Sequence, residues 1–559
     1  MNKFENAKNN FEKGIKAFKA KELALSEKYF LEGLKYAPES VPLLENLSKV
    51  YLIIGDYEKA ERYLINLTSL NKDGNEIGFQ ILIELYKNLN EYWKLNDLIE
   101  LGFKKKKINF YNYLKGKLFY PKFFTSKEDL EKIRENYLNE IKKINTDTKI
   151  EKINFYPHFI KPSNWDLSYD GCDNLKIFKE LNKFYNKIYP EIEKLENPKK
   201  SLNTKIKIGF ISEFFSDHTI MKLFKGIIYK LDKNVFDVYV FHSNKTLNGK
   251  QFNEIKESVV LYGHENIILP IEFGQKVREI ENKNLDILFY TDIGMSTNLY
   301  YLTLLKLAKL QITSWGHGET TGNSKINYFL SSKFLETEGY ENKYSENVIL
   351  SNYLPMYFYK PKIVDEISLE ELKIKNHYCC PQSLFKLHPD FDLIIKKILE
   401  KDKKAKITFI KDRNGILSRL FINRLKKIMT ENLDRIEFID RMTPEEYINH
   451  CGKASVILDP LYFGAGNSFH ESMYYGTPTV TKPTNFLKGR IVTGAYSQMQ
   501  IDNPPVVKDI DEYADLCVDL ANKNILDLKM YYKEQAEKNL YENLNAVKDL
   551  ENIFKSITN

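Results

Sequence analysis

A glycine-bearing loop between an expected strand and an expected helix is the strongest chemical signal in the sequence. The apolar run 456–459 leads into a segment that contains Gly464 and Gly466, and a helix is expected to begin near Ser468. Glycine lets the backbone come close to an anion, and the first turn of a helix offers unpaired N–H groups and the positive end of the helix dipole. The loop predicts a phosphate cradle, with an ordinary glycine-rich turn as the alternative.

Polar residues beside this loop and in other loops complete a candidate site. Asn467 can donate a side-chain hydrogen bond or cap the helix, and Glu471, one turn further on, can accept one from a ribose hydroxyl. His218 and His317 follow expected strands, and Lys386 precedes an expected helix. A single histidine is more often structural than catalytic, but together these loops predict one cleft at the strand ends of two sheets.

The elements that must position these residues form two consecutive α/β halves. From residue 205 onward, short apolar runs alternate with stretches of helical period, which is typical of a parallel, doubly wound sheet. The expected strands are 206–212, 236–241, 286–290 and 311–315, and then 407–410, 436–439, 456–459 and 478–481. We therefore expect an α/β fold with one Rossmann-like half over 201–365 and another over 366–559.

Residues 1–108 are expected to form all-α, tetratricopeptide-like repeats. Landmarks separated by the roughly 34-residue period of such repeats are Tyr51, Ala60 and Leu64 and, one period earlier, Ala17, Ser26 and Phe30. A third unit keeps the helical period but loses these landmarks. Repeats of this kind are packing and binding platforms. Residues 109–200 are helical in period, show no recognisable chemistry, and are expected to be a connecting region that ends in a linker at 197–201.

Composition and charge exclude several classes of protein. The chain has 559 residues, of which 43% are hydrophobic, enough to exclude an intrinsically disordered protein. Its net charge of +7 is small and diffuse, so no nucleic-acid partner is predicted. Five cysteines without a Cys-x-x-Cys spacing argue against a disulfide framework or a zinc site. A polar N-terminus and the lack of an apolar stretch of about 18 residues predict a cytoplasmic protein without a membrane span.

The motifs together resemble glycosyltransferase family 41, the group of O-GlcNAc transferase, SPINDLY and HMW1C-like enzymes. The resemblance covers about residues 205–500 and is carried, in family order, by 208–212 with His218, 290–295, 315–322, 383–389, 458–471, 475–478 and 489–491. Tetratricopeptide repeats ahead of the catalytic region also fit the family. The resemblance implies a GT-B pair of halves, with acceptor and sugar on the first and the nucleotide sugar, usually UDP-linked, on the second. It implies transfer with inversion to a protein side chain, without a metal or other cofactor.

The resemblance also implies roles for individual residues. Lys386 corresponds to a lysine that contacts the diphosphate, where a fixed cation stabilises charge on the leaving group. His218 corresponds to a histidine that is either the base or a contact to the sugar or acceptor, so the expected catalytic residues are His218 and Lys386. The expected donor-binding residues are His317, Ser383, Phe385, Lys386, Tyr447, Gly464, Gly466, Asn467, Ser468, Glu471 and Arg490.

Departures from the animal members leave the donor sugar open. The run 466–468 replaces their His-Thr-Thr, and His450 stands where arginine is common among them. The expected reaction moves GlcNAc from a UDP-sugar to Ser or Thr of a protein that the repeats recruit, with glucose, fucose and a GDP donor as open alternatives. Two other functions also stay open: an HMW1C-like N-glucosyltransferase that acts on asparagine, and a repeat scaffold whose nucleotide-sugar-binding domain is not catalytic.

Overall fold

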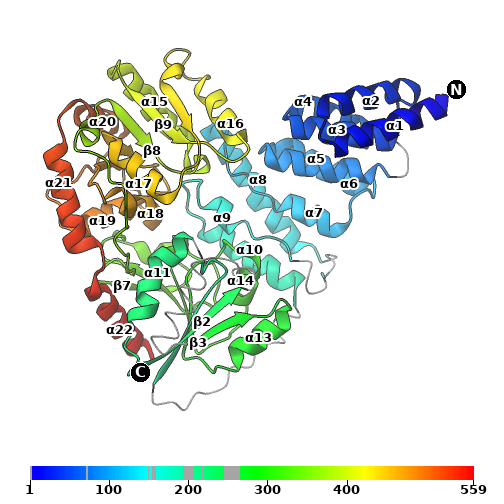
Figure 1. The fold of residues 1–559 in the computed structure, drawn as a ribbon. Helices are drawn as coiled ribbons and strands as arrows, with labels where there is room; N and C mark the ends of the chain where they lie inside the picture. The colour runs from blue at the N-terminus through cyan, green and yellow to red at the C-terminus, as the bar shows by residue number, and fades with distance from the viewer. Residues whose placement is uncertain are drawn as a thin grey trace. The chain divides into compact units, whose positions relative to one another are not determined.

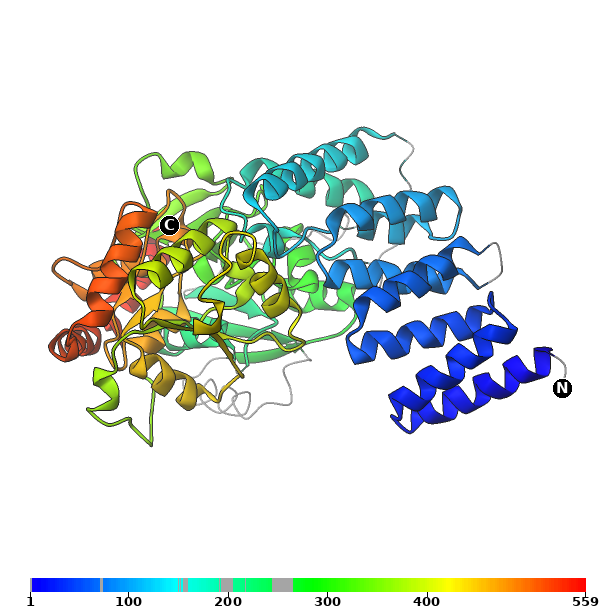
Figure 2. The same cartoon turned by 90° about the horizontal axis from the view of Figure 1, so that it is seen from above.

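The chain divides into two compact units, Met1–Pro121 and Lys122–Asn559 (Figures 1 and 2). The structure is a computed structural model, and it describes residues 3–70, 74–148, 150, 152–153, 159–190, 192, 205–216, 218–243 and 265–558. Helix α7 (Phe110–Lys117) belongs to the first unit, so this unit extends beyond the predicted boundary at residue 108. The predicted linker 197–201 lies outside the described residues.

The first unit is an array of helical hairpins. Its other helices are α1 (Lys3–Lys19), α2 (Leu23–Tyr36), α3 (Val41–Ile54), α4 (Tyr57–Ser69), α5 (Glu76–Asn88) and α6 (Tyr92–Lys104). The α3–α4 turn depends on Gly55, whose φ of 86° favours glycine, and on Asp56, whose carboxylate caps α4.

One hydrogen bond recurs along the array. The Tyr51 hydroxyl donates to Glu27 at 2.8 Å, and the Tyr86 hydroxyl donates to Glu61 at 2.9 Å, about one repeat later. The third unit therefore stays in phase with the first two, although its sequence landmarks are lost.

The second unit begins with connecting helices and a parallel sheet. The helices are α8 (Lys127–Thr146), α9 (Asn164–Leu167) and α10 (Leu175–Ile188). The sheet has the order β3-β2-β1-β4-β5-β6-β7, and its strands are β1 (Ile206–Ser212), β2 (Phe236–Ser243), β3 (Glu265–Leu269), β4 (Ile287–Tyr290), β5 (Leu310–Ser314), β6 (Tyr328–Ser332) and β7 (Asn347–Ser351). Between strands lie α11 (Thr219–Lys230), α13 (Phe273–Glu281) and α14 (Thr297–Thr303). The sequence patterns did not predict β3, β6 or β7.

A second parallel sheet follows, with the order β10-β9-β8-β11-β12. Its strands are β8 (His377–Cys380), β9 (Lys406–Ile410), β10 (Ile436–Ile439), β11 (Val456–Leu458) and β12 (Thr479–Val480). Its helices include α15 (Pro389–Lys401), α16 (Ile416–Leu425), α17 (Pro444–Lys453), α18 (Asn467–Ser472), α19 (Ile491–Met499) and α20 (Ile510–Asn522). The central strand β8 was not predicted because His-Tyr-Cys-Cys lacks the β-branched residues that mark strands.

The end of the chain returns to the first sheet. After α21 (Leu526–Gln535), α22 (Leu544–Thr558) places Phe554 edge-on to Phe236 and Phe289, with ring centroids 6.3 and 6.1 Å apart. Asp549 of the same helix accepts a hydrogen bond from the Ser351 hydroxyl at 2.7 Å. The expected half 366–559 therefore contributes its last helix to the core of the other half. The two Rossmann-like halves are the GT-B arrangement predicted from the sequence.

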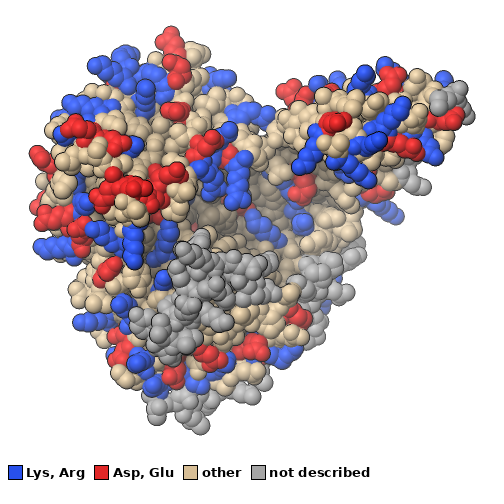
Figure 3. All heavy atoms as spheres, in the orientation of Figure 1, with Lys and Arg blue, Asp and Glu red and all other residues tan. Residues whose placement is uncertain are grey.

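Charges of both signs are interspersed over the face of the second unit shown in Figure 3, in keeping with the diffuse charge of the sequence. Within the described ranges, no helix is both long enough and apolar enough to cross a membrane.

Candidate active site

A buried carboxylate at the end of β11 braces the glycine loop. Asp459 is 2% exposed, and its carboxylate accepts hydrogen bonds from the Ala465 N–H and the Thr481 hydroxyl, both at 2.6 Å. Burial raises the pKa of Asp459 to about 6, and these two hydrogen bonds oppose the rise. A Cβ at Gly464 would lie 3.2 Å from Asp459 Oδ2, so glycine lets the loop fold tightly around the carboxylate.

The far end of the loop offers open space and a polar atom. A Cβ at Gly466 would meet nothing within 4 Å, and α18 begins at the next residue. The side-chain oxygen of Asn467 is buried and has no hydrogen-bond partner among the described residues. Buried acceptors are normally satisfied, so this oxygen keeps an unused capacity to accept a hydrogen bond.

Lys386 is connected to the same loop by the side chain of Gln382, which was not predicted from the sequence. It lies in the 3-10 helix η6 (Leu384–Lys386), and its Nζ donates to Gln382 Oε1 at 2.9 Å. The amide nitrogen of Gln382 in turn donates to the Ser468 hydroxyl. Burial lowers the pKa of Lys386 to about 8, with the Asp459 carboxylate acting against the shift. Gln382 was missed because it follows β8, the strand that the sequence did not predict.

The other residues predicted to contact the nucleotide lie beside this chain of hydrogen bonds. Ser383 is exposed at the start of η6, and Phe385 is half-buried. The Tyr447 hydroxyl donates to the carbonyl of Pro381, the residue before Gln382, at 3.2 Å. The structure thus brings Ser383, Phe385 and Tyr447 to the segment that carries Lys386, and their contacts to a nucleotide stay predictions.

His218 lies at the start of α11 and caps it. The Ile220 N–H donates to His218 Nδ1 at 3.3 Å, and the ring lies 4.6 Å from the Phe214 ring. Burial lowers the pKa of His218, and Lys222 adds to the effect, so the ring is neutral at pH 7. A neutral ring that accepts at Nδ1 carries its proton on Nε2. This tautomer favours donation to a sugar or acceptor oxygen over the role of base.

An ion pair connects the His218 helix to the predicted ribose contact. Lys222, one turn after His218, lies 2.5 Å from Glu471 Oε1 and so joins α11 of the first half to α18 of the second. Lys222 was not predicted, although its spacing of four residues from His218 places both on one helix face.

His317 is buried at the end of β5. It closes the 3-10 helix η3 (Trp315–His317), is 3% exposed, and has its Nε2 2.8 Å from the Ser168 hydroxyl. Burial and the nearby Lys488 ammonium lower the pKa of His317 to about 3, against a hydrogen bond to the Ile293 backbone. His317 is therefore neutral and fixed in place.

Residues 163–175, here called the connecting segment, form a further wall of the site. The segment includes α9 and leads into α10. The Trp165 ring lies 5.4 Å from the His317 ring, and the Tyr169 ring lies 4.8 Å from the Phe385 ring. The sequence showed no chemistry in this stretch, because the partners of these rings are far away along the chain.

Arg490 lies at the boundary of the two halves and holds backbone atoms. Its Nε donates to the Leu335 carbonyl at 3.0 Å, and one terminal nitrogen donates to the Thr484 carbonyl at 3.3 Å. These contacts give Arg490 a structural role, and its predicted contact with the donor is untested. In the part of the chain that the structure describes, no three His, Cys, Asp or Glu side chains are grouped to hold a metal ion, and metal independence stays a prediction.

A relative by sequence and a solved structure belong to the same group of enzymes. No protein-family profile matches the chain. An Arabidopsis thaliana protein, described as "Probable UDP-N-acetylglucosamine--peptide N-acetylglucosaminyltransferase SEC", is 20% identical over 373 residues, which are 64% of this chain and 37% of that protein. The chain thus spans well under half the length of this curated relative.

A solved structure extends the similarity to the whole chain. A mutant of the O-GlcNAc transferase of Thermobaculum terrenum superposes with a TM-score of 0.66 over 100% of this chain and 98% of that one, at 15% identity. The sequence relationship and the shared fold confirm the resemblance of this chain to glycosyltransferase family 41, the O-GlcNAc transferase group.

Proposed function

We propose that this protein is a metal-independent glycosyltransferase that moves a sugar, with inversion, from a UDP-sugar to a serine or threonine hydroxyl of a protein. The observation that carries the proposal is the chain of hydrogen bonds from Lys386 through Gln382 to Ser468. It sets the amine of the half-buried Lys386 beside the open end of the glycine loop. A diphosphate needs a cation and hydrogen-bond donors in one place, and these residues supply both.

GlcNAc is the proposed sugar, and a cytoplasmic protein is the proposed acceptor. The Arabidopsis relative is described as a peptide N-acetylglucosaminyltransferase that uses a UDP-linked sugar, which supports GlcNAc as the sugar and a peptide as the acceptor. Helical repeats are binding platforms, so the first unit is proposed to recruit the acceptor.

The proposed reaction is a single in-line displacement. The acceptor oxygen forms a bond to the anomeric carbon, the bond from that carbon to the diphosphate oxygen breaks, and UDP leaves with the electron pair. Lys386 stabilises the charge that develops on the diphosphate. Glu471 accepts from a ribose hydroxyl, and His218 orients the sugar or acceptor through Nε2–H. The proton of the acceptor hydroxyl passes to water as the new glycosidic bond forms.

Binding and transfer assays test the proposal. Calorimetry with EDTA present should show binding of UDP and UDP-GlcNAc to the wild type and weaker binding of GDP. Incubation with UDP-GlcNAc and cytoplasmic protein should yield products whose sugar is released by alkaline β-elimination, as expected for an O-linkage. Modification that resists β-elimination and maps to asparagine would support the N-linked alternative. Nucleotide binding without any transfer would favour the scaffold whose nucleotide-sugar-binding domain is not catalytic. Absence of nucleotide binding would contradict the proposal.

A further inference from the structure

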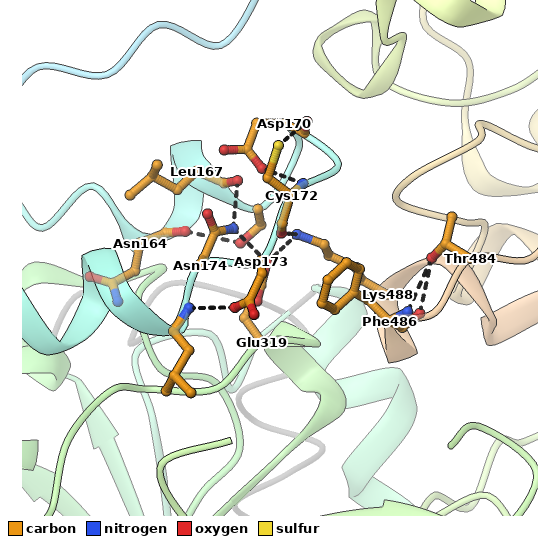
Figure 4. A network of polar contacts seen from close by, with 12 residues as sticks. Asn164, Leu167, Asp170, Cys172, Asp173, Asn174, Glu319, Thr484, Phe486 and Lys488 are labelled. Atoms are coloured by element: carbon orange, nitrogen blue, oxygen red, sulfur yellow. Dashed lines mark hydrogen bonds and ion pairs between the residues drawn. The ribbon is translucent and has the colours of Figure 1, made fainter. Parts of the chain in front are cut away.

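A buried ion pair lies between the two halves, outside the predicted site residues. Lys488 of the 3-10 helix η8 (Leu487–Gly489) is 1% exposed, and its ammonium pairs with the carboxylate of Glu319, which is 8% exposed. Lys488 Nζ also donates to the Cys172 carbonyl at 3.3 Å, and Asn174 Nδ2 donates to Glu319 Oε1 at 2.9 Å. In Figure 4, Lys488 and Asn174 converge on the Glu319 carboxylate.

Each end of this pair is one backbone hydrogen bond away from a site loop. The Lys488 carbonyl accepts from the Gly464 N–H at 2.7 Å, which ties Lys488 to the glycine loop. The Glu319 N–H donates to the His317 carbonyl at 2.7 Å, which ties Glu319 to the loop after β5. The ion pair therefore connects the glycine loop of the second half to the His317 loop of the first half.

The connecting segment closes the network. Asn174 and the Cys172 carbonyl hold the ion pair, and Ser168 of the same segment holds His317. Three parts of the chain that are distant in sequence thus meet at one buried salt bridge.

A structural role alone accounts poorly for this arrangement. Burying two charges has a large desolvation cost, and a buried ion pair is weak evidence for stability, because apolar residues of similar size often stabilise a protein as well or better. Buried polar pairs do specify one geometry over its alternatives in some proteins. The geometry specified here is the placement of one site loop against the other.

We propose that Lys488 and Glu319 are positioning residues whose ion pair sets the glycine loop against the His317 loop. A nucleotide sugar held by its diphosphate would then present its sugar to the His317 loop at reacting distance. The inference rests on the proposed function. The side chains that hold the diphosphate there, Lys386 and Ser468, are linked by Gln382 and not by Glu319. Loss of the ion pair should therefore reduce turnover and leave UDP affinity unchanged.

A pair of variants separates positioning from stability. Lys488→Met leaves the Glu319 charge buried and unpaired and should lower the melting temperature. The double variant Lys488→Met with Glu319→Gln removes both charges and should recover most of that loss. Misplacement of a reacting group by about 1 Å costs about 100-fold in rate, so the double variant should still hydrolyse UDP-GlcNAc about 100-fold more slowly than the wild type.

The control is an exposed ion pair, Lys360–Glu537, whose side chains are 40% and 42% exposed. Its double variant, Lys360→Met with Glu537→Gln, should match the wild type. All measurements use the full chain. They are the melting temperature, the dissociation constant for UDP by calorimetry, and kcat and KM for UDP release.

The outcomes separate the inference from the proposed function. Recovery of stability with wild-type UDP affinity but low kcat supports positioning. Recovery of kcat together with stability, or a matching loss of UDP affinity, would overturn it and leave the ion pair a structural contact. A wild-type protein that neither binds UDP nor releases it from UDP-GlcNAc would overturn the proposed function itself.

Discussion

Binding of a diphosphate should make this protein take up a proton at Lys386. In the ligand-free protein, burial lowers the pKa of Lys386 to about 8, and the Asp459 carboxylate opposes the shift. A bound diphosphate places negative charge beside the amine and returns its pKa toward the ordinary value of 10.5. Above pH 7, some amines that were neutral before binding are therefore protonated after it.

The size of the effect follows from these two pKa values. An amine with a pKa of about 8 is about 90% protonated at pH 7, about half protonated at pH 8 and about 10% protonated at pH 9. UDP binding should thus take up about 0.1, 0.5 and 0.9 proton at these three pH values. The terminal phosphate of UDP ionises near pH 6, so it adds little to the proton uptake between pH 7 and pH 9. Above pH 8, UDP affinity should fall by about tenfold per pH unit until the pKa of the complex is reached.

Calorimetry in two buffers of different ionisation enthalpy measures the proton uptake directly. The variant Lys386→Met keeps most of the length of the side chain, removes the amine, and should show no uptake at pH 9. It should also lower kcat by about 100- to 1000-fold, the usual cost of removing one group that stabilises transition-state charge. Equal proton uptake in Lys386→Met and the wild type, or none in the wild type at pH 9, would refute the placement of this amine at the diphosphate.

Three further predictions test other parts of the proposed site. Gly466→Ala should have the melting temperature of the wild type, because a Cβ there meets nothing within 4 Å. It should weaken UDP binding by about tenfold. Unchanged affinity by calorimetry would place the phosphates elsewhere. His218→Asn keeps an N-cap and should slow turnover about 10-fold, the worth of one hydrogen bond. The dependence of the rate on pH should stay the same. Loss of the acidic limb of the pH–rate profile would identify His218 as the base. Deletion of residues 1–121 should leave UDP binding and donor hydrolysis intact and should abolish transfer to protein. Assays of donor hydrolysis and of transfer measure the two activities. Equal loss of both activities would make the repeats part of the catalytic fold.

Features that depend on neighbours along the chain could be predicted from the sequence. Strand–helix alternation, the glycine loop before α18 and the Gly-Asp turn between α3 and α4 are local patterns, and the structure contains all three. Prediction failed where the local signal was weak. Strand β8 was missed because it lacks β-branched residues, and with it Gln382, the side chain that connects Lys386 to Ser468.

The sequence by itself thus predicted the alternation of strands and helices, the repeat period and a set of candidate site residues. Only the tertiary structure decided how these residues are held. Ser168 meets His317 across 149 positions, Lys488 meets Glu319 across 169, and Lys222 meets Glu471 across 249. No spacing in the sequence encodes such pairs, because the sheets bring them together only after the halves have folded against each other and against the connecting segment.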